Sequence, residues 1–298
     1  MNRYVAIVTG WGGNLGTGHV QRMASLAAHL MSRGIPCSIC APDPPLFFPP
    51  NLKALFTRDI PPDATLIIRD KRDSSIDEIV SLKRIAPVIA IDDCGDGRNE
   101  ADRAIDLLPN LLYPFDPQGP RLYGYSFCES IRQLAGTRIR KDIDLAVYCG
   151  LPSDERILTL VRSILPSSCR AVLLAAGTIM PLTAMNGVSD NYTPPIALCM
   201  ARVIITYFGI TLYEGVCAGC KGITINPTPY HSRLADIAQS ETGAVNLGDI
   251  THIDTATVRS TFHAVLERAT LDAIDASDIA MRIEDGLQRL YRMFHEYL

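Results

Sequence analysis

The chain lacks the features that mark a nucleic-acid-binding or membrane-spanning protein. Its 298 residues include 28 lysines and arginines against 32 aspartates and glutamates, which gives a formal net charge of −4. A nucleic-acid-binding surface is basic, so this class of protein is excluded. No uncharged apolar run reaches the roughly 18 residues that a membrane span needs. The opening apolar run is too short for a signal peptide, so we expect a cytoplasmic protein with no integral membrane segment.

The nine cysteines are an odd number, and several of them lie in apolar runs. This pattern is typical of small buried hydrophobic residues in a reducing compartment. Two Cys-x-x-Cys pairs, Cys37/Cys40 and Cys217/Cys220, resemble halves of a zinc site on paper. However, residues three apart on a strand point to opposite faces, and Cys217 lies inside a predicted helix. The sequence therefore predicts no metal site and no cofactor.

The composition and the pattern of apolar segments indicate a folded α/β protein. Hydrophobic residues make up 47% and charged residues 20% of the chain, which is typical of a folded globular protein. Apolar runs alternate with amphipathic helical segments, as in βαβ units with a parallel sheet. The length allows two domains. A charged, weakly patterned link at 135–142 predicts an N-terminal domain over 1–138 and a C-terminal domain over 139–298.

The first half contains four predicted buried strands and two predicted helices. The strands are expected at 4–9, 35–41, 64–69 and 87–91, and the helices at 19–30 and 76–84. Between Pro42 and Pro62 we expect an irregular excursion that carries Phe47 and Phe48, with a short strand near 52–56.

The second half repeats the same pattern. Strands are expected at 143–149, 171–176, 203–206 and 223–226, and helices at 153–165, 196–201, 210–217, 232–238 and 254–269. Ser153 and Ser277 are the expected N-caps of two helices. The helix at 277–298 has an apolar stripe that must pack on another part of the protein. Together the halves predict two doubly wound α/β domains of similar kind that face each other across a cleft.

A glycine-rich turn between the first strand and the first helix is the most informative motif. Gly16, Thr17 and Gly18 lie at the start of the helix, where free backbone N–H groups and the helix dipole favour an anion such as phosphate. Glycine is required where a turn takes positive φ or passes close to a ligand. A dinucleotide-binding turn is an alternative, since Asp43 follows the second strand where a ribose-binding acid is expected.

His19 and Arg22 open the same helix and share one face, because they lie one turn apart. The helix dipole disfavours a cationic imidazole at this end, so His19 is a candidate general base. Arg22 is either a clamp for phosphate or carboxylate, or the partner of Asp92 or Asp93. These two aspartates end a parallel strand at the same edge of the sheet, and we expect them to hold His19 or Arg22 in place.

A second strand–turn–helix lies at 207–214. Phe208, Gly209, Ile210 and Thr211 would present backbone N–H groups and a hydroxyl to a diphosphate at the helix N-terminus. Glu214 lies one turn further along, where its carboxylate could accept hydrogen bonds from sugar hydroxyls; alternatively, it is a favourable charge near the start of the helix. His231 follows the next strand and is placed to meet a substrate.

Several of these segments resemble the nucleotide-sugar hydrolases of the pseudaminic acid pathway. That group includes spore-coat polysaccharide biosynthesis proteins and is related to the glycosyltransferases that build lipid II. The resemblance covers residues 5 to 238 and is carried by 15–22, 91–93, 106–110, 124–127 and 204–214. It implies a GT-B fold, with two Rossmann-like domains and a C-terminal helix that crosses back to the first domain.

The resemblance also implies roles for individual residues. His19 would activate water for attack at the anomeric carbon, with Arg22 and Asp92 beside it and Asp93 near the substrate. The turn at 209–211 would hold the diphosphate, and Glu214 the ribose. The Gly-Gly-x-Asp turn of the family is here Gly150-Leu151-Pro152-Ser153-Asp154, and a family glutamine is replaced near His231, so Gly150 and His231 stand where nucleotide or sugar is recognised.

These observations predict hydrolysis of a nucleoside-diphosphate sugar, with UDP the expected nucleotide, in the synthesis of cell-surface glycans. Two alternatives stay open: a glycosyltransferase that uses the same donor on an acceptor, and a non-catalytic nucleotide-sugar-binding protein. A dehydrogenase is a more distant alternative, based on the dinucleotide reading of the turn. The sequence does not define the sugar or the oligomeric state.

Overall fold

The computed structural model describes residues 3–12, 16–45, 48–175, 177–183 and 192–298. Leu15, the first residue of the segment at 15–22, and Phe47 of the predicted excursion lie outside these ranges. The chain divides into two compact units. The first unit comprises Met1–Tyr125 and Ile283–Leu298, and the second comprises Ser126–Arg282. The division falls inside helix α4 (Tyr125–Gln133), before the link at 135–142 where the sequence places it.

The first unit is built on a parallel six-stranded sheet with the order β3-β2-β1-β4-β5-β6. Its strands are β1 (Val5–Thr9), β2 (Cys37–Cys40), β3 (Phe56–Thr57), β4 (Leu66–Asp70), β5 (Val88–Ile91) and β6 (Arg103–Ile105). Every residue of β1, β2, β4 and β5 is buried, which explains why these strands appear in the sequence as continuous apolar runs. The predicted strand near 52–56 is wrong in part, because Pro50 opens the short helix α2 (Pro50–Lys53) there.

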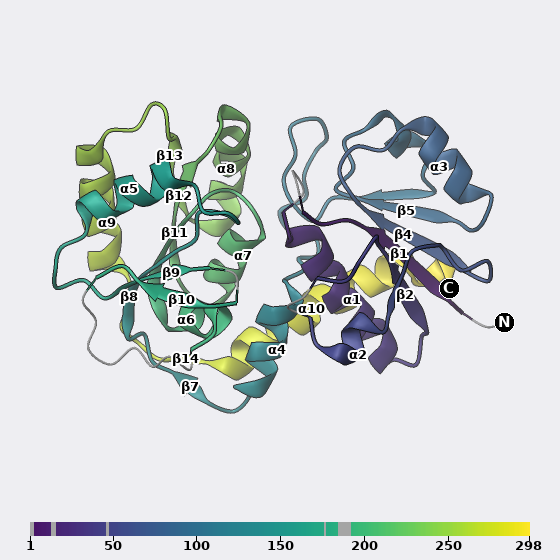
Figure 1. Cartoon of the computed structure of the whole chain (residues 1–298), viewed down its shortest axis with the longest axis horizontal. Helices are drawn as coiled ribbons and strands as arrows, with labels where there is room; N and C mark the ends of the chain where they lie inside the picture. The colour runs from purple at the N-terminus through teal and green to yellow at the C-terminus, as the bar shows by residue number, and fades with distance from the viewer. Residues whose placement is uncertain (1–2, 13–15, 46–47, 176, 184–191) are drawn as a thin grey trace. The chain divides into compact units, whose positions relative to one another are not determined.

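Helices cover both faces of this sheet (Figure 1). Helix α1 (Gly18–Ser32) packs on β1 and β2, while α3 (Ile76–Lys83) covers an apolar cluster on the other face that includes Ile67, Ile79 and Val88. A 3₁₀ turn, η2 (Asp96–Glu100), follows β5. The arrangement is doubly wound, as predicted.

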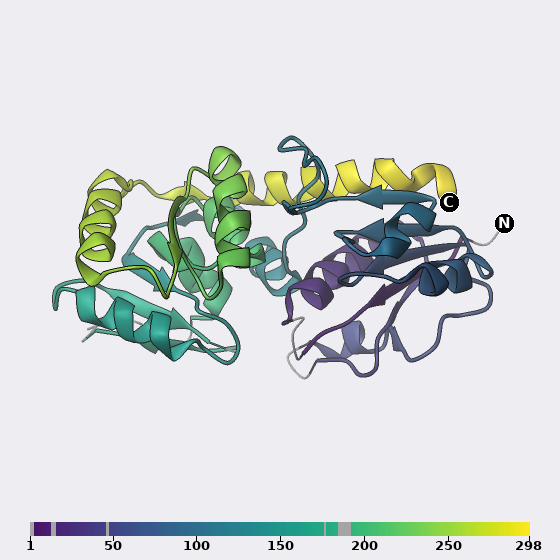
Figure 2. The ribbon, with the colours of Figure 1, turned by 90° about the horizontal axis from the view of Figure 1, so that it is seen from above.

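The C-terminal segment packs on the first unit. Helix α10 (Ala276–Phe294) contributes Leu287, Leu290 and Phe294, all almost fully buried, and the turn η3 (His295–Tyr297) follows it. Gly286 has no space for a Cβ, which would lie 2.1 Å from the carbonyl oxygen of Arg121. The later turns of α10, drawn in yellow in Figure 2, therefore lie directly on the backbone of the first unit. The N-cap prediction for Ser277 is corrected, because Asp275 accepts a hydrogen bond from the Ser277 N–H at 2.8 Å.

The second unit repeats the design with the strand order β10-β9-β8-β11-β12-β13, parallel except for β10. Its sheet contains β8 (Ile143–Val147), β9 (Ala171–Leu174), β10 (Ile179–Pro181), β11 (Ala201–Thr206), β12 (Lys221–Asn226) and β13 (Val245–Asp249). A separate two-stranded ribbon is formed by β7 (Arg138–Ile139) and β14 (Ile274–Asp275).

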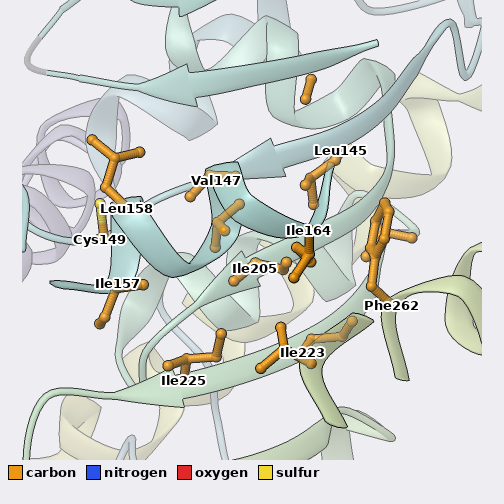
Figure 3. Close-up of a cluster of buried hydrophobic side chains, with 14 of the residues drawn as sticks. Leu145, Val147, Cys149, Ile157, Leu158, Ile164, Ile205, Ile223, Ile225 and Phe262 are labelled. Carbon is orange, nitrogen blue, oxygen red and sulfur yellow. The ribbon is translucent and has the colours of Figure 1, made fainter. Parts of the chain in front are cut away.

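Helices again cover both faces of the larger sheet. They are α5 (Glu155–Ile164), α6 (Pro194–Met200), α7 (Ile210–Cys217), α8 (Pro229–Thr242) and α9 (Thr255–Arg268). Figure 3 shows one face, where Ile157 and Ile164 of α5 and Phe262 of α9 pack on strand residues such as Val147 and Ile205. The predicted N-cap Ser153 is corrected to Asp154, whose side chain accepts from the Arg156 N–H.

No helix among the described residues is long and apolar enough to cross a membrane. The nine cysteines, all within the described ranges, are free thiols.

Candidate active site

Each sheet has one point where the chain changes direction, and the predicted site residues gather at these points. In the first sheet β1 is followed by β2 on one side and β4 on the other. In the second sheet β8 lies between β9 and β11 in the same way. Ligands of open α/β sheets bind outside the carboxyl ends of the strands at such switch points. Ligand-binding residues are therefore expected at the ends of β1 and β4 and at the ends of β8 and β11.

His19 lies beside the switch point of the first sheet. Its Nδ1 is 2.7 Å from Oδ1 of Asp70, the last residue of β4, and the Asp70 side chain has no exposed surface. Asp70 is in register with Thr9 at the end of β1, and the Thr9 hydroxyl donates to the Asp70 carbonyl oxygen at 3.0 Å. An ionised carboxylate only accepts hydrogen bonds, so we assign a proton to Nδ1, the ring nitrogen that faces Asp70.

The turn before α1 has the geometry that its glycines predict. Gly12 and Gly16 have φ of +82° and +63°, and the Gly12 N–H donates to the Gly16 carbonyl oxygen at 2.8 Å. Gly18 is the first residue of α1, and Thr17 is its N-cap. The turn therefore places His19 in the first helical turn, where the dipole disfavours a cation.

Arg22 is bound entirely by protein carboxylates. Its Nε and Nη2 donate to the two oxygens of Asp70 at 2.6 and 2.5 Å, and its Nη1 donates to Oδ2 of Asp92 at 2.5 Å. The side chain is only 3% exposed. Of the two sequence interpretations, the structure contains the ion pair with Asp92, to which it adds Asp70.

Asp92 follows β5 with φ of +48°, the one non-glycine residue with positive φ within the described part of the chain. Its Oδ1 accepts from the N–H groups of Leu107 and Leu108 at 2.6 and 3.1 Å. Non-glycine residues in this conformation are uncommon and concentrate at functional sites. Both carboxylate oxygens of Asp92 are thus used, one by Arg22 and one by the backbone after β6.

The three charged groups have shifted pKa values. Burial would raise the pKa of Asp70, but the charges and hydrogen bonds of Arg22 and His19 overcome it and lower the pKa to about 2. Asp70 therefore stabilises the fold above its ordinary pKa, and this contribution is lost as the pH falls toward about 2. Burial raises the pKa of Asp92, against the effect of Arg22. Burial lowers the pKa of Arg22, but the two carboxylates reverse this effect and raise it.

Asp93, predicted to lie near the substrate, belongs to a separate buried network. Its carboxylate has no exposed surface; Oδ2 is 3.1 Å from Nη1 of the buried Arg69, and Oδ1 accepts from the N–H groups of Ser74 and Gly95 at 2.9 Å. The structure thus separates the neighbouring aspartates, because consecutive residues point in different directions. Asp92 joins the His19 network, whereas Asp93 ties the loop after β4 to the loop after β5.

In the second unit, the predicted turn lies at the end of β11, and Gly209 is the N-cap of α7. The Phe208 N–H donates to Oδ1 of the fully buried Asn226 at 2.9 Å, so it is used within the protein. Ile210 and Thr211 form the first turn of α7, whose N–H groups have no partner inside the helix. Glu214 lies beyond that first turn, which corrects the interpretation of its carboxylate as a first-turn charge.

Tyr148 and Tyr207, after β8 and β11, line the same sheet edge, with ring centroids 5.9 Å apart. A Cβ at Gly150, which has φ of +96°, would lie 3.4 Å from the Tyr207 ring, so glycine allows the backbone to approach this ring. The His231 ring packs edge-on against Tyr207 at 6.0 Å, and its Nδ1 is 2.8 Å from the Thr228 hydroxyl. The structure thus brings Gly150, Phe208, Gly209 and His231 to one end of the second sheet.

Lys141 fixes the opposite end of α7. This buried side chain donates to the carbonyl oxygens of Ala201 and Ala218 at 2.8 and 2.5 Å. These two residues are the C-caps of α6 and α7. An ammonium group at a helix C-terminus is stabilised by the helix dipole, so one cation holds both helix ends.

Asn226 also joins a polar network that braces the turn before α7. Its Nδ2 donates to Oδ1 of Asn246 on β13 at 2.9 Å, and Nδ2 of Asn246 donates to Asp236 of α8 at 2.7 Å. We expect Asn226→Leu to destabilise the second unit by about 1–3 kcal/mol, because the buried Phe208 N–H would lose its acceptor.

Urea unfolding followed by far-ultraviolet circular dichroism checks this expectation. The matched control is Asn51→Leu, because Asn51 is an exposed asparagine of α2. Equal unfolding midpoints for wild type and Asn226→Leu would show that the network does not stabilise the turn.

Sequence analysis missed Asp70, Asn226 and Asn246. Asp70 and Asn226 each end a buried parallel strand at the edge that carries the predicted site, the same signal that selected Asp92. Asp43, the alternative ribose-binding acid, is exposed and lies 3.7 Å from Arg58. Among the described residues, no group of three or more His, Cys, Asp or Glu side chains could hold a metal ion.

Several solved structures that resemble this chain are glycosyltransferases. MurG of Acinetobacter baumannii has a TM-score of 0.60 at 11% identity, covering 99% of both chains. The calicheamicin glycosyltransferase CalG4 has a TM-score of 0.57 at 14% identity, covering 100% of this chain and 98% of its own. The spinosyn rhamnosyltransferase SpnG, complexed with thymidine diphosphate, has a TM-score of 0.57 at 13% identity, covering 98% and 99%.

At these identities the likeness establishes the fold, which is GT-B, with two Rossmann-like units as predicted. Neither a protein-family model nor a curated protein matches the sequence. The similar structures therefore support a glycosyltransferase-like fold. They do not support a specific membership of the pseudaminic acid hydrolases. The expectation of hydrolysis is wrong, since the similar structures are glycosyltransferases and fit the transferase alternative.

Proposed function

We propose that the protein is a glycosyltransferase that moves a sugar from a nucleoside diphosphate to a hydroxyl group of an acceptor. The observation that carries this proposal is the pair formed by His19 and the buried Asp70 at the switch point of the first sheet. A histidine whose Nδ1 proton is held by a carboxylate presents Nε2 as a proton acceptor. The GT-B fold of the chain supports the same reaction class.

In this proposal the second unit binds the donor. Backbone N–H groups of Gly209, Ile210 and Thr211 would bind the diphosphate, because a helix N-terminus favours negative charge. Glu214, one turn further along α7, would accept hydrogen bonds from the ribose hydroxyls. Phe208 and Gly150 would shape the nucleotide site through their backbone, with His231 beside them.

The first unit supplies the base. Nε2 of His19 would remove the proton of the acceptor hydroxyl as its oxygen attacks the anomeric carbon of the sugar. The bond from that carbon to the diphosphate oxygen breaks, and the nucleoside diphosphate leaves with the bonding electrons. A single displacement of this kind inverts the anomeric centre. The turn at Gly16, Thr17 and Gly18 would face the donor's sugar or phosphate.

Acceptor-dependent release of nucleoside diphosphate tests the proposal. UDP-, TDP- and GDP-sugars are first screened for binding by calorimetry and then incubated with simple sugars and with hydroxylated aglycones such as the spinosyn aglycone, an acceptor-type ligand bound by one similar structure. We expect diphosphate release that requires an acceptor, and an inverted glycosidic product by NMR. Binding of a nucleotide sugar without transfer to any acceptor would favour a non-catalytic binding protein.

A further inference from the structure

Arg22 and Asp92 form a bridge that reaches the proposed base through Asp70. The guanidinium joins two carboxylates that lie at the ends of different strands, Asp70 on β4 and Asp92 after β5. Each of its three nitrogens donates to a carboxylate oxygen at 2.5 or 2.6 Å. A planar guanidinium in such a fork fixes the orientation of its partners, which an ammonium group does not do.

The bridge fixes both oxygens of Asp70. Oδ2 accepts from Nε of Arg22, while Oδ1 accepts from Nη2 of Arg22 and from Nδ1 of His19. The carboxylate therefore cannot rotate without breaking charged hydrogen bonds. Nη2 of Arg22 is also 3.4 Å from Nδ1 of His19, so a cation lies next to the imidazole on the side away from Nε2.

Asp92 anchors the other end of the bridge with a strained backbone. Its positive φ directs the carboxylate between Arg22 and the N–H groups of Leu107 and Leu108. Asparagine and glycine tolerate this conformation better than aspartate, but neither would supply an anion to Arg22. The contact of Asp92 with Arg22 accounts for the strained backbone conformation at Asp92.

We propose that Arg22 and Asp92 are positioning residues, which hold Asp70 so that His19 keeps its proton on Nδ1 and presents Nε2. The expected effect of Arg22 and Asp92 on kcat rests on the proposed function. The tautomer of His19 is independent of any substrate. The two can therefore be tested separately.

The first test is NMR of the whole chain labelled with ¹⁵N-histidine. His19→Gln identifies the His19 resonances among the six histidines of the sequence. In the wild type we expect a neutral ring protonated at Nδ1, with a downfield Nδ1 proton. In Arg22→Lys and in Asp92→Asn we expect loss of that proton signal and a mixture of tautomers, because Asp70 gains freedom to rotate.

The second test is kinetic. Asp92→Asn keeps an acceptor for Leu107 and Leu108 and suits positive φ, so it removes the anion with little change in shape. We expect kcat to fall about 10-fold in Asp92→Asn and about 100-fold in Arg22→Lys, with KM for donor and acceptor nearly unchanged, as for a misplaced catalytic group. Restoring an anion at the same place with Asp92→Glu should recover part of the loss.

Arg98→Lys is the matched control. Arg98 forms a two-pronged ion pair with Asp106 at 2.8 and 2.7 Å in the same unit and also donates to the Asp93 carbonyl oxygen at 2.8 Å, so its hydrogen bonds lie outside the His19 network. We expect it to lose stability as Arg22→Lys does but to keep the His19 spectrum. An unchanged His19 spectrum in Arg22→Lys and Asp92→Asn would overturn the inference, whether or not the protein transfers sugars. If Arg22→Lys fails to fold, the His19 spectrum of Asp92→Asn alone decides whether the inference holds.

Discussion

Replacing His19 by alanine is expected to lower kcat for sugar transfer by about 10²- to 10⁴-fold, the usual contribution of a general base. The donor is expected to bind as before, because the proposed nucleotide site belongs to the second unit. Calorimetric titration of the nucleotide measures binding, and acceptor-dependent diphosphate release measures kcat. A variant that retains full activity would remove His19 from the mechanism.

Asp70→Asn is expected to cause a loss of similar size. The amide would present either an oxygen or an NH₂ group to His19 and Arg22, and an NH₂ group facing Nδ1 favours the wrong tautomer. Since the two residues act as one unit, the double variant should be about as impaired as either single variant. Additive losses would show that Asp70 acts independently of His19.

His252→Ala is the matched control for both variants. His252 also faces a carboxylate, with Nδ1 2.9 Å from Asp249, but it lies on the surface of the second unit and is 78% exposed. Its removal is expected to leave kcat unchanged. The comparison separates a histidine–aspartate pair at a sheet switch point from the same pair on the surface.

The sheets could be predicted from the sequence because their strands are buried on both faces. A parallel strand covered by helices is a continuous apolar run, as in β1 and β5, and such runs are hard to mistake. Edge elements lack this signal. β13, whose Val245 is exposed, contains asparagine, glycine and aspartate, and no strand was predicted there.

The histidine and the glycine turn could also be predicted, because they lie together in the sequence. Their partner could not be chosen in the same way. Asp70 belongs to a charged stretch, Arg69-Asp70-Lys71-Arg72-Asp73, which has the composition of a solvated loop. The register of β4 with β1 decides which residue of that stretch is buried against the turn, and register depends on the whole sheet.

The sequence could not predict that Asp92 and Asp93 join different networks, and the reason is related. The positive φ of Asp92 sends its side chain toward Arg22, while Asp93 turns to Arg69. Backbone conformation at one residue thus separates two identical side chains into two networks. The network of Asp92 serves both stability and the proposed reaction, whereas the network of Asp93 and Arg69 serves stability alone.

Arg69→Met is expected to destabilise the first unit by about 3–5 kcal/mol, the cost of leaving a buried charge without its partner. Arg69 is almost fully buried, and its Nε and Nη2 each lie 3.0 Å from Glu78, while Nη1 lies 3.1 Å from Asp93. The loops that it joins have no room to adjust, since a Cβ at Gly95 would lie 2.2 Å from the Ser74 carbonyl oxygen.

Urea unfolding followed by tryptophan fluorescence measures this effect, because Trp11 is the one tryptophan of the sequence and belongs to the first unit. Arg58→Met is the control; its ion pair with Asp43 spans 3.7 Å between exposed side chains, and such pairs contribute little. The double variant Arg69→Met/Asp93→Asn should recover part of the loss, because it removes the unpaired charge. If the double variant is no more stable than Arg69→Met, the cost comes from lost packing and from the unmet backbone carbonyls of Lys71 and Arg72 rather than from the charge of Asp93.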